Sequence, residues 1–473
     1  METPVASPPA LTIEGRPTLV RGLTLLDSVL LLVGGVIGSS IFLTAKDIAG
    51  PLPHPALFLL VWVLGGLISM CACFAFAELG TMFPDSGGQY VYMREAYGDL
   101  PAFLYGWTMF SVGNGGSIAA LAVGSAAYLG GIVPAISQSH VVLSVAGMVV
   151  TRAQIAALLM IVVVTWINIV GLRWGAMLQN VATWAKFGAM GAFVILGFAI
   201  GKGEWHHFTG KGWGTVSGLT TGMGAGQLLS AFGVALIAVF WAYDGWVYIG
   251  WVAGEIKDPR RNVPLALVLG VTIVGIIYVA MNMAYLYALP ITEIAKHETI
   301  AHAAATALFS PTAAVWLSAL IAVSCFGALA CAILSAARVY YAMALDGLFF
   351  RRMAEVHPKW RTPAFALIGQ AVWAGILTLS GRYDQLYTYV IFASAILYGM
   401  ATASVIVLRF RRPDMPRPYR TLGYPVVPIA FVLGIACLIA STLRSSPRES
   451  VLGLLLIALG LPFYFYWKKR ASV

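Results

Sequence analysis

Apolar runs of about 20 residues, separated by short clusters of charged residues, follow one another along the chain. A run of this length is what an α-helix needs to cross the hydrocarbon core of a bilayer. The chain is 60% hydrophobic and only 10% charged, whereas soluble domains carry about 25% charged residues. The pattern predicts an all-α polytopic membrane protein with twelve transmembrane helices. The runs are 24–46, 55–83, 101–130, 150–171, 176–201, 229–254, 264–289, 312–342, 364–380, 384–409, 425–443 and 449–467.

Basic residues are distributed unequally between the two sides that these runs define. Of the 29 Lys and Arg, 20 fall on the side of the N-terminus, eight fall on the opposite side and Lys186 lies inside a helix. An excess of Lys and Arg marks the cytoplasmic side of a membrane protein. We therefore expect a multi-pass protein of the cell (plasma or inner) membrane with both termini in the cytoplasm. The net charge of +10 then indicates topology and contact with the lipid bilayer, not binding to nucleic acid.

The stretch VGGVIGSSIF, residues 33–42, places three glycines and two serines inside the first run. Gly costs about 1 kcal/mol relative to Ala in a helix interior. A second such stretch, FWAYDGWVYIG at residues 240–250, places Asp244 and Gly245 inside the sixth run. Interrupted helices at corresponding positions of two halves are typical of transporters with inverted repeats. We therefore predict a 5+5 inverted repeat with broken helices 1 and 6.

This repeat predicts the domain organisation. In chain order it comprises a cytoplasmic N-terminal segment 1–23, a first repeat 24–201, an outer loop 202–228, a second repeat 229–410, helices 11 and 12 in 411–468, and a cytoplasmic tail 469–473. Two shorter helical stretches are also expected, one interfacial helix in 87–98 and one in the outer loop 290–311.

A broken helix exposes backbone groups at mid-membrane depth, which is tolerated where they line a cavity. The outer half of helix 1 would begin near Ser39, where free N–H groups and the positive end of the helix dipole suit a carboxylate. The inner half would end near Val36, and its free carbonyls, with that of Trp241, suit an ammonium group. Such a site fits the zwitterion of an α-amino acid. The alternative is that these glycines are packing contacts between helices.

Six motifs resemble those of the amino acid–polyamine–organocation (APC) superfamily, and most closely those of its L-type amino acid transporter branch in the bacterial form. They are GGVIGSSIF (34–42), FAELGTMFPDSGGQYVYMREAYG (76–98), WAYDGW (241–246), GEIKDPRRNVP (254–264), SCFG (324–327) and RFRRPDMPRP (409–418). The resemblance covers nearly the whole chain. It implies the five-plus-five fold, alternating access and transport of L-amino acids, with no cofactor.

The resemblance also implies roles for individual residues. The backbone N–H groups expected to hold the substrate carboxylate are those of Ser39, Ser40 and Ile41. The carbonyls expected to hold the amino group are those of Val36, Trp241 and Asp244, and the Trp241 side chain is expected to act as a gate. The residues expected to flank the substrate side chain are Val112, Gly113, Asn114, Tyr243 and Ser394.

Two features depart from the family pattern. Gly38, Ser39 and Ser40 stand where the family usually has Gly-Ser-Gly, and the extra hydroxyl narrows the space in favour of smaller substrates. The loop 131–149 contains no cysteine, whereas the animal L-type light chains use a cysteine in this loop to tether a glycoprotein. No disulfide-linked heavy chain is therefore expected.

Lys186 lies in the fifth run, within NVATWAKFGAMG. A lysine at this depth is costly and is by default a functional hypothesis, although it could also be a snorkelling residue. In the family, a lysine at this place substitutes for the sodium ion of sodium-coupled relatives. It is expected to bridge broken helix 1 to helix 8, with Ser324 as its partner. This implies sodium-independent transport and leaves both exchange and proton-linked transport open.

Other polar residues have more than one interpretation. Asp244 could counter the substrate ammonium or select basic substrates, or it could cap the exposed amides of broken helix 6. Asp27 and Glu78, near the inner helix ends, are expected to be gate or interface residues. His206 and His207 are adjacent on the outer loop and are expected to be solvated, so no metal site is predicted.

The expected function is therefore secondary transport of neutral L-amino acids. The alternative is a cationic amino acid or polyamine exchanger on the same fold, for which Asp244 is the only support. An enzyme is not expected, because the seven histidines fall in loops or at helix ends and no HExxH or GxSxG motif occurs. A channel is disfavoured because the broken-helix site implies occlusion of the substrate.

Overall fold

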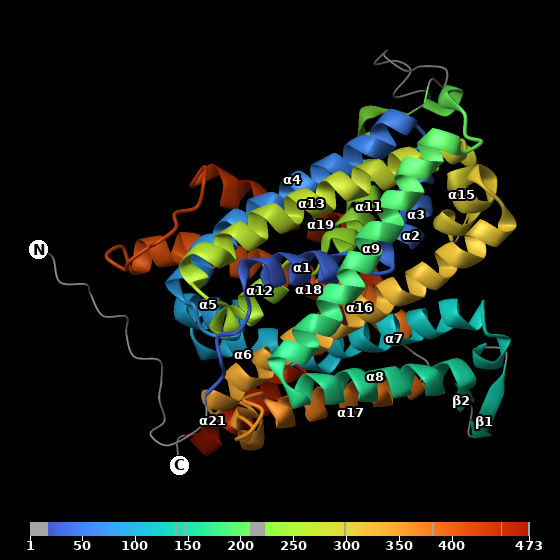
Figure 1. Cartoon of the computed structure of the whole chain (residues 1–473). Helices are drawn as coiled ribbons and strands as arrows, with labels where there is room; N and C mark the ends of the chain where they lie inside the picture. Colours follow the sequence, from blue (N-terminus) through green and yellow to red (C-terminus); the bar gives the residue numbers. More distant parts are fainter. Residues whose placement is uncertain are drawn as a thin grey trace, which may run out of the picture.

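The computed structural model describes residues 18–137, 140–145, 148–208, 223–297, 299–380, 383–445 and 447–471. It is mostly helical (Figure 1). Ten helices in these ranges are long and apolar enough to cross a membrane. The predicted polytopic helical fold is thus confirmed. The count of twelve stays a prediction, because the helix over Ala364–Ser380 is shorter than these and the third predicted run is divided.

The helices and strands follow one another along the chain in three parts. The first part of the chain forms α1 (Leu25–Val36), α2 (Ser40–Leu43), α3 (Ala45–Ala49), α4 (Pro55–Met82), α5 (Gln89–Tyr97), α6 (Asp99–Thr108), the π-helix η1 (Met109–Gly113), α7 (Asn114–Gly130), the 3-10 helix η2 (Pro134–Ile136), β1 (Val141–Val145), β2 (Met148–Thr151), α8 (Arg152–Val170) and α9 (Leu172–Ile200). The middle part forms the 3-10 helix η3 (Trp205–Phe208), α11 (Ala225–Tyr243), α12 (Tyr248–Trp251), the 3-10 helix η4 (Ala253–Glu255), α13 (Pro259–Ala288), α14 (Ile291–Ile294), α15 (Ile300–Leu308) and α16 (Pro311–Leu345). The last part forms the 3-10 helix η5 (Arg351–Ala354), α17 (Ala364–Ser380), α18 (Tyr383–Arg411), α19 (Val426–Ser445), α20 (Pro447–Ala458) and α21 (Gly460–Ala471).

Several helices begin at side chains that satisfy their first N–H groups. Thr24 and Asp27 form a reciprocal capping box at the start of α1, with 2.9 Å between Thr24 N and an Asp27 carboxylate oxygen. Thr151 caps α8 with Gln154 in the same way. Ser310 caps α16 and is followed by Pro311, whose missing N–H costs nothing in the first turn of a helix. These local signals define where the apolar runs become helical.

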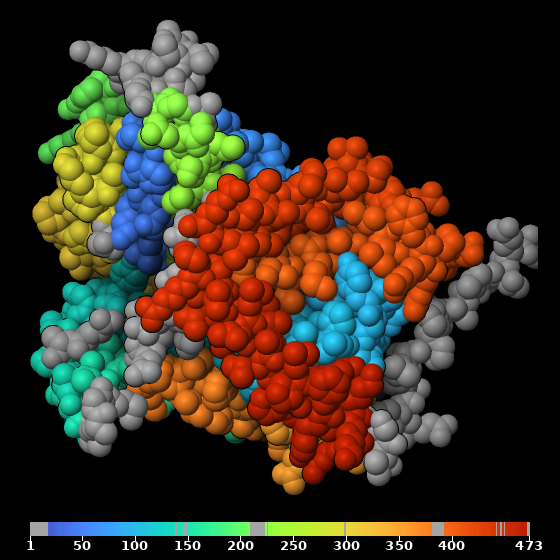
Figure 2. All heavy atoms as spheres, turned by 180° about the vertical axis from the view of Figure 1, so that it is seen from behind, coloured from blue at the N-terminus to red at the C-terminus, as the bar shows by residue number. Residues whose placement is uncertain are grey.

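The helices pack around α1 and α16. Figure 1 shows α4 and α13 side by side at one edge and α7, α8 and α17 at the other, with α1 and α16 between them. In the spanning window of each of these two central elements, 72% of the residues are buried, against 28% for α9. From the opposite side, the C-terminal helices (orange to red) cover one face and lie over α5 and α6 (Figure 2). The broken helix α1–α2 is therefore in the interior of the bundle.

The structure agrees with the expected shorter helices and departs from expectation in three details. Helix α5 occupies the predicted interfacial stretch, and α14 and α15 lie in the loop 290–311. The loop between α7 and α8 contains an antiparallel hairpin of β1 and β2, so the protein is not entirely helical. The third run is interrupted by η1, and the last run is divided between α20 and α21. Part of the loop 202–228 and of both termini lies outside the described residues.

Candidate functional site

Two helices are interrupted in the interior, at the predicted places. Helix α1 ends at Val36 and α2 begins at Ser40, so three residues separate the two halves. Helix α11 ends at Tyr243 and α12 begins at Tyr248. Gly245 in the second interruption has φ +119°, a conformation that residues with a Cβ rarely adopt. Both interruptions therefore arise where the sequence puts weak helix formers.

The two interruptions touch each other. A Cβ added to Gly245 would lie 2.9 Å from the carbonyl carbon of Gly35 and from the nitrogen of Val36. A Cβ on Gly34 would lie 2.3 Å from Thr183 Oγ1, and one on Gly35 would lie 2.7 Å from the Tyr248 ring. The glycines of helix 1 thus permit close packing and border the break at the same time, so the two interpretations of these residues are not exclusive.

Tyr278 of α13 links the two interruptions, and no motif in the sequence singles it out. Its hydroxyl lies 3.1 Å from the carbonyl oxygen of Val36 and 2.8 Å from that of Ala242. The side chain is fully buried and packs edge-on against Trp62, with 5.3 Å between ring centroids. The only sign of Tyr278 in the sequence is that it lies in the middle of a predicted helix. Because the chain has 20 tyrosines, that sign does not single it out.

Backbone N–H donors and carbonyl acceptors both lie at the two breaks. Ser39 is the N-cap of α2, and Ser40 and Ile41 are its first two residues, so the N–H groups of these three residues have no intrahelical acceptor. The carbonyl of Val36 already accepts from Gly38 N at 2.9 Å and lies near Tyr278. The carbonyl of Trp241 accepts from Asp244 N at 3.2 Å. A carbonyl oxygen has two lone pairs, and that of Val36 already accepts from two donors, Gly38 N and the Tyr278 hydroxyl.

Lys186 of α9 reaches the unwound end of α1. Its Nζ donates to the carbonyl oxygens of Gly34 at 2.7 Å and Ile37 at 2.6 Å, and its side chain is only 2% exposed. Ser324 of α16 lies on the other side of the same backbone, with Oγ 3.4 Å from Ile37 O and 3.3 Å from Gly38 O. The two residues therefore share the Ile37 carbonyl instead of bonding to each other as the sequence suggested.

Asp244 is engaged by donors of the protein itself. Its Oδ1 accepts from the N–H of Gly245 at 2.8 Å and from the hydroxyl of Tyr398 at 3.1 Å. Of its two interpretations, capping of the broken helix is the one that these contacts match. Through its hydrogen bond with Tyr398, the carboxylate also connects the break between α11 and α12 to α18.

The predicted pocket residues do not all face the same way. Val112 and Gly113 belong to the π-helix η1, a type of distortion that is frequent at functional sites, and Asn114 follows it. Asn114 is 4% exposed and its side-chain amide lies beside the Tyr340 hydroxyl of α16. Ser394 of α18 is also buried, and Trp241 in the last turn of α11 is half-buried.

Tyr243 is the exception among these pocket residues. Its hydroxyl donates to Trp62 O at 3.1 Å, and its ring packs against those of Trp62 and Tyr278, at 6.4 and 5.1 Å between centroids. Its side chain therefore points toward α4 and α13. The pocket role of Tyr243 stays a prediction, and its ring contacts Tyr278, whose hydroxyl reaches both breaks.

A buried ion pair joins α16 to η4 on the side of the bundle where α1 begins. Arg338 of α16 donates from Nε and Nη2 to the two carboxylate oxygens of Glu255, at 2.6 and 3.0 Å. Neither side chain is more than 1% exposed. The Glu255 carbonyl also accepts from the N–H groups of Gly22 and Leu23, just before α1. No role was predicted for this pair from the sequence, although Glu255 lies in the motif GEIKDPRRNVP.

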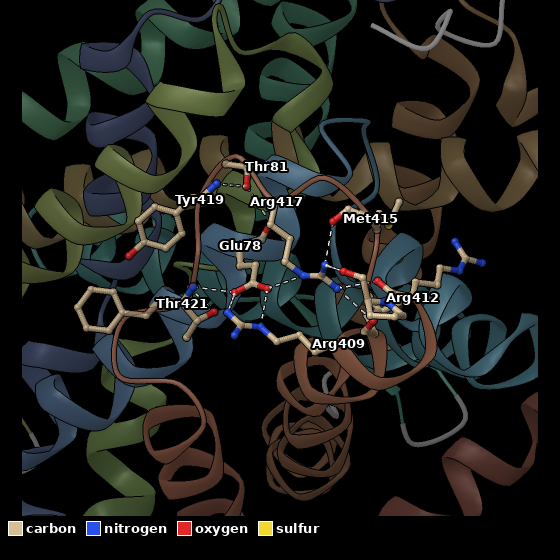
Figure 3. A network of polar contacts seen from close by, with 11 residues as sticks. Glu78, Thr81, Arg409, Arg412, Met415, Arg417, Tyr419 and Thr421 are labelled. Carbon is tan, nitrogen blue, oxygen red and sulfur yellow. Dashed lines mark hydrogen bonds and ion pairs between the residues drawn. The ribbon is translucent and has the colours of Figure 1, made fainter. Parts of the chain in front are cut away.

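Asp27 and Glu78 both lie at interfaces between elements. Asp27 accepts from Asn180 of α9 at 2.6 Å. Figure 3 shows Glu78 of α4 between Arg409 and Arg417, with Thr421 N also donating to its carboxylate at 2.7 Å. Glu78 is fully buried, and its closest contact is 2.6 Å, to Arg409. This carboxylate therefore joins α4 to the end of α18 and to the segment that follows it.

A helical membrane protein with two interrupted helices that meet in its interior has the architecture of a secondary transporter. Residues 23–458 match the amino acid permease family, and the chain belongs to this family. It is 31% identical over 457 residues to the serine/threonine exchanger SteT of Bacillus subtilis, covering 96% of this chain and 98% of the relative. It is 31% identical over 470 residues to the b(0,+)-type amino acid transporter 1 of Mus musculus (96% and 91%). It is 28% identical over 477 residues to the large neutral amino acids transporter small subunit 2 of Homo sapiens (98% and 84%). The protein is thus an amino acid transporter of the APC superfamily and not an enzyme.

Proposed function

We propose that this transporter exchanges small neutral L-amino acids across the cell membrane, without sodium, at the junction of its two broken helices. The observation that carries the proposal is the meeting of Gly245 with Gly35 and Val36, which brings the ends of four half-helices to one place. N–H groups at the start of one half-helix and carbonyls at the end of another are then adjacent, as an α-amino acid zwitterion requires. The segments 24–201 and 229–410 are the two repeats that would move relative to each other.

The substrate carboxylate would accept from the N–H groups of Ser39, Ser40 and Ile41, and the amino group would donate to the carbonyls of Val36, Trp241 and Asp244. Since the Tyr278 hydroxyl already lies 3.1 Å from Val36 O, the incoming ammonium would take over part of that contact. Binding would in this way loosen the link that Tyr278 makes between the broken helices. Closure of Trp241 over the substrate completes the occluded state in this proposal.

Two contacts support a neutral and small substrate. Oδ1 of Asp244 accepts from Gly245 N and the Tyr398 hydroxyl, and this capping of broken helix 6 would compete with binding of a distal ammonium. The buried Asn114 amide, which lies beside the Tyr340 hydroxyl, has two N–H groups and would donate to the hydroxyl of serine or threonine. The name of the serine/threonine exchanger among the relatives agrees with this substrate class.

Lys186 supports the sodium independence. Its ammonium already satisfies the Gly34 and Ile37 carbonyls, which a sodium ion would otherwise use at this place. The side where α1 begins is proposed to be cytoplasmic, as the Lys and Arg distribution predicts. The Glu255–Arg338 pair would then be a cytoplasmic gate that is closed in this conformation. We also propose that the chain works without a disulfide-linked heavy chain.

The test is counterflow with the purified chain in proteoliposomes loaded with L-serine, in sodium or choline buffer and with or without a pH gradient. We expect L-serine, L-threonine and L-alanine to compete with labelled L-serine better than L-arginine, putrescine or D-serine. Uptake should be equal in the two buffers and should require substrate on the other side. Stronger competition by L-arginine or putrescine would favour the cationic alternative, and uptake into empty vesicles driven by a pH gradient would replace exchange with proton-linked transport.

Asn114→Ala gives a sharper test of the pocket. This variant removes the proposed amide donor, so L-serine should lose affinity relative to L-alanine. A hydrogen bond of this kind is worth about 0.5–1.5 kcal/mol, or roughly two- to tenfold. An unchanged ratio of the two affinities would place the substrate side chain elsewhere.

A further inference from the structure

Three side chains with metal-binding groups gather just after α9, on the side of the molecule opposite the start of α1. They are Glu204, His206 and His207, and one potential ligand atom from each lies within 4.8 Å of the others. The segment is held in place by its neighbours: Glu204 N donates to Tyr287 O at 2.9 Å, and the Trp205 ring lies 4.9 Å from that of Tyr287. The cluster is therefore fixed to the end of α13.

The orientation of His207 is the first argument for a site. Its Nδ1 lies 3.1 Å from Leu286 O and 3.2 Å from Tyr287 O. Both are carbonyl oxygens, which only accept, so Nδ1 carries the hydrogen. In the neutral ring, the lone pair is then on Nε2, which faces Glu204 Oε2 at 3.9 Å. A histidine held to backbone carbonyls through one nitrogen, with the other presented to a carboxylate, is the arrangement that supports metal ligation.

The spacing of the three groups is the second argument. Zn²⁺ binds nitrogen and oxygen ligands at about 2.0–2.2 Å in tetrahedral geometry, so its ligand atoms lie roughly 3.3–3.6 Å apart. Here Glu204 Oε2 is 2.7 Å from His206 Nδ1 and 3.9 Å from His207 Nε2. The side chains of Glu204 and His206 are 59% and 70% exposed and can adjust, while His207 is 11% exposed and stays in place. Small rotations thus bring the three atoms to ligand spacing.

We propose that Glu204, His206 and His207 bind a divalent transition-metal ion of the Zn²⁺ class, and that the bound ion restrains transport. Two imidazoles and one carboxylate suit Zn²⁺, Cu²⁺ or Ni²⁺, whereas Mg²⁺ and Ca²⁺ prefer oxygen ligands alone. A fourth position remains for water. All three ligands belong to the segment that follows α9, so the ion would make this segment rigid. The segment contacts the end of α13 through Glu204 N and His207, and α13 carries Tyr278, which contacts both broken helices.

The binding test does not depend on the identity of the transported substrate. The full-length protein, freed of metal with EDTA and desalted, is titrated with ZnCl₂ while bound zinc is measured by equilibrium dialysis and elemental analysis. We expect one Zn²⁺ per chain, unaffected by excess Mg²⁺. His206→Ala and Glu204→Gln should each weaken binding at least about tenfold, as the loss of even a supporting contact does at metal sites. His140→Ala removes an exposed histidine of the loop between α7 and α8 and should bind as the wild type does.

The transport test uses the same proteins in L-serine counterflow with Zn²⁺ outside the vesicles. We expect Zn²⁺ to slow exchange by the wild type and by His140→Ala but not by His206→Ala, whose largely exposed side chain can be removed without loss of folding. Failure of the wild type to retain zinc, or equal affinity in His206→Ala and Glu204→Gln, would overturn the site. Stoichiometric binding with an unchanged exchange rate would overturn the restraint on α13.

Discussion

Replacing Glu255 with Gln should open the side of the molecule where α1 begins. The substitution preserves the size of the side chain but removes its charge. Arg338 would then keep its guanidinium in a site where it is only 1% exposed, without the two charged contacts at 2.6 and 3.0 Å that now compensate it. The pair joins η4 to α16, so the cost of the uncompensated Arg338 charge destabilises the closed arrangement, in which the guanidinium is buried. In the open arrangement water can reach the guanidinium and the cost is smaller.

The size of the effect follows from the burial of the pair. Removing one partner of a fully buried ion pair costs about 3–5 kcal/mol. With 1.36 kcal/mol for each factor of ten, this corresponds to a shift of roughly two to three and a half orders of magnitude toward the open arrangement. A transporter that must visit both arrangements should then exchange more slowly, even though it still binds substrate.

Cys331 provides a native reporter for this opening. It is fully buried, and its Sγ would be 3.3 Å from a Cβ on Gly34, so it becomes accessible only when α1 moves away. We expect Glu255→Gln to increase the rate at which a water-soluble maleimide labels Cys331, as resolved by mass spectrometry of the labelled peptides. L-Serine counterflow should fall in parallel.

A matched control distinguishes this gate from a general effect of charge removal. Glu95 pairs with Arg412 at 2.6 Å, but the side chains are 20% and 48% exposed, and such pairs are worth about 0–1 kcal/mol. Glu95→Gln should therefore label and exchange as the wild type does. If Glu255→Gln behaves like this control in both measurements, the buried pair does not hold the closed arrangement and the reasoning fails.

Three further outcomes are expected. Lys186→Ala leaves the Gly34 carbonyl without its ammonium donor and the Ile37 carbonyl with only the Ser324 hydroxyl at 3.4 Å. An unmet buried group costs about 1–3 kcal/mol, so counterflow should fall about tenfold or more while substrate binding persists; wild-type counterflow in this variant would contradict the role of the lysine. Gly245→Ala places a Cβ 2.9 Å from the backbone of helix 1 at a residue with φ +119°. This variant should therefore lose the monodisperse peak of the folded protein in size-exclusion chromatography, whereas Gly275→Ala, whose Cβ would have its nearest contact at 3.6 Å, should keep it. Trp241→Ala should retain folding but lose most uptake, and normal uptake would remove its gate role.

The broken helices could be predicted from the sequence because their cause is local. Clustered glycines and serines weaken a helix wherever they occur, and the same residues border the breaks at Val36 and Tyr243 in the structure. The reach of Lys186 to helix 1 was expected only from the family resemblance. Its sharing of the Ile37 carbonyl with Ser324 required the structure, since it depends on how α9 and α16 are placed around α1.

Contacts between distant segments could not be predicted in this way. Arg338 and Glu255 are 83 positions apart, and Arg409 and Glu78 are 331 apart, so no local pattern pairs them. The contacts of Tyr243 with Trp62 and Tyr278 could not be predicted either, because the direction of its side chain depends on the rotation of α11, which sequence spacing does not define. The π-helix η1 results from a single extra residue per turn and leaves no composition signal.

Helix α16 is longer than the hydrocarbon layer that it crosses. Its 35 residues extend about 52 Å, whereas the layer is about 30 Å thick. Even at the 40° limit of observed helix tilts, it would span roughly 40 Å along the membrane normal, so its ends project into the head-group region. Arg338 lies seven residues, about 10 Å, from the end at Leu345. Arg338 therefore lies near the boundary of the hydrocarbon layer, from which its long side chain can extend the guanidinium to the lipid phosphates and water. For the proposed gate, this depth would lower the cost of separating Arg338 from Glu255 during a transport cycle.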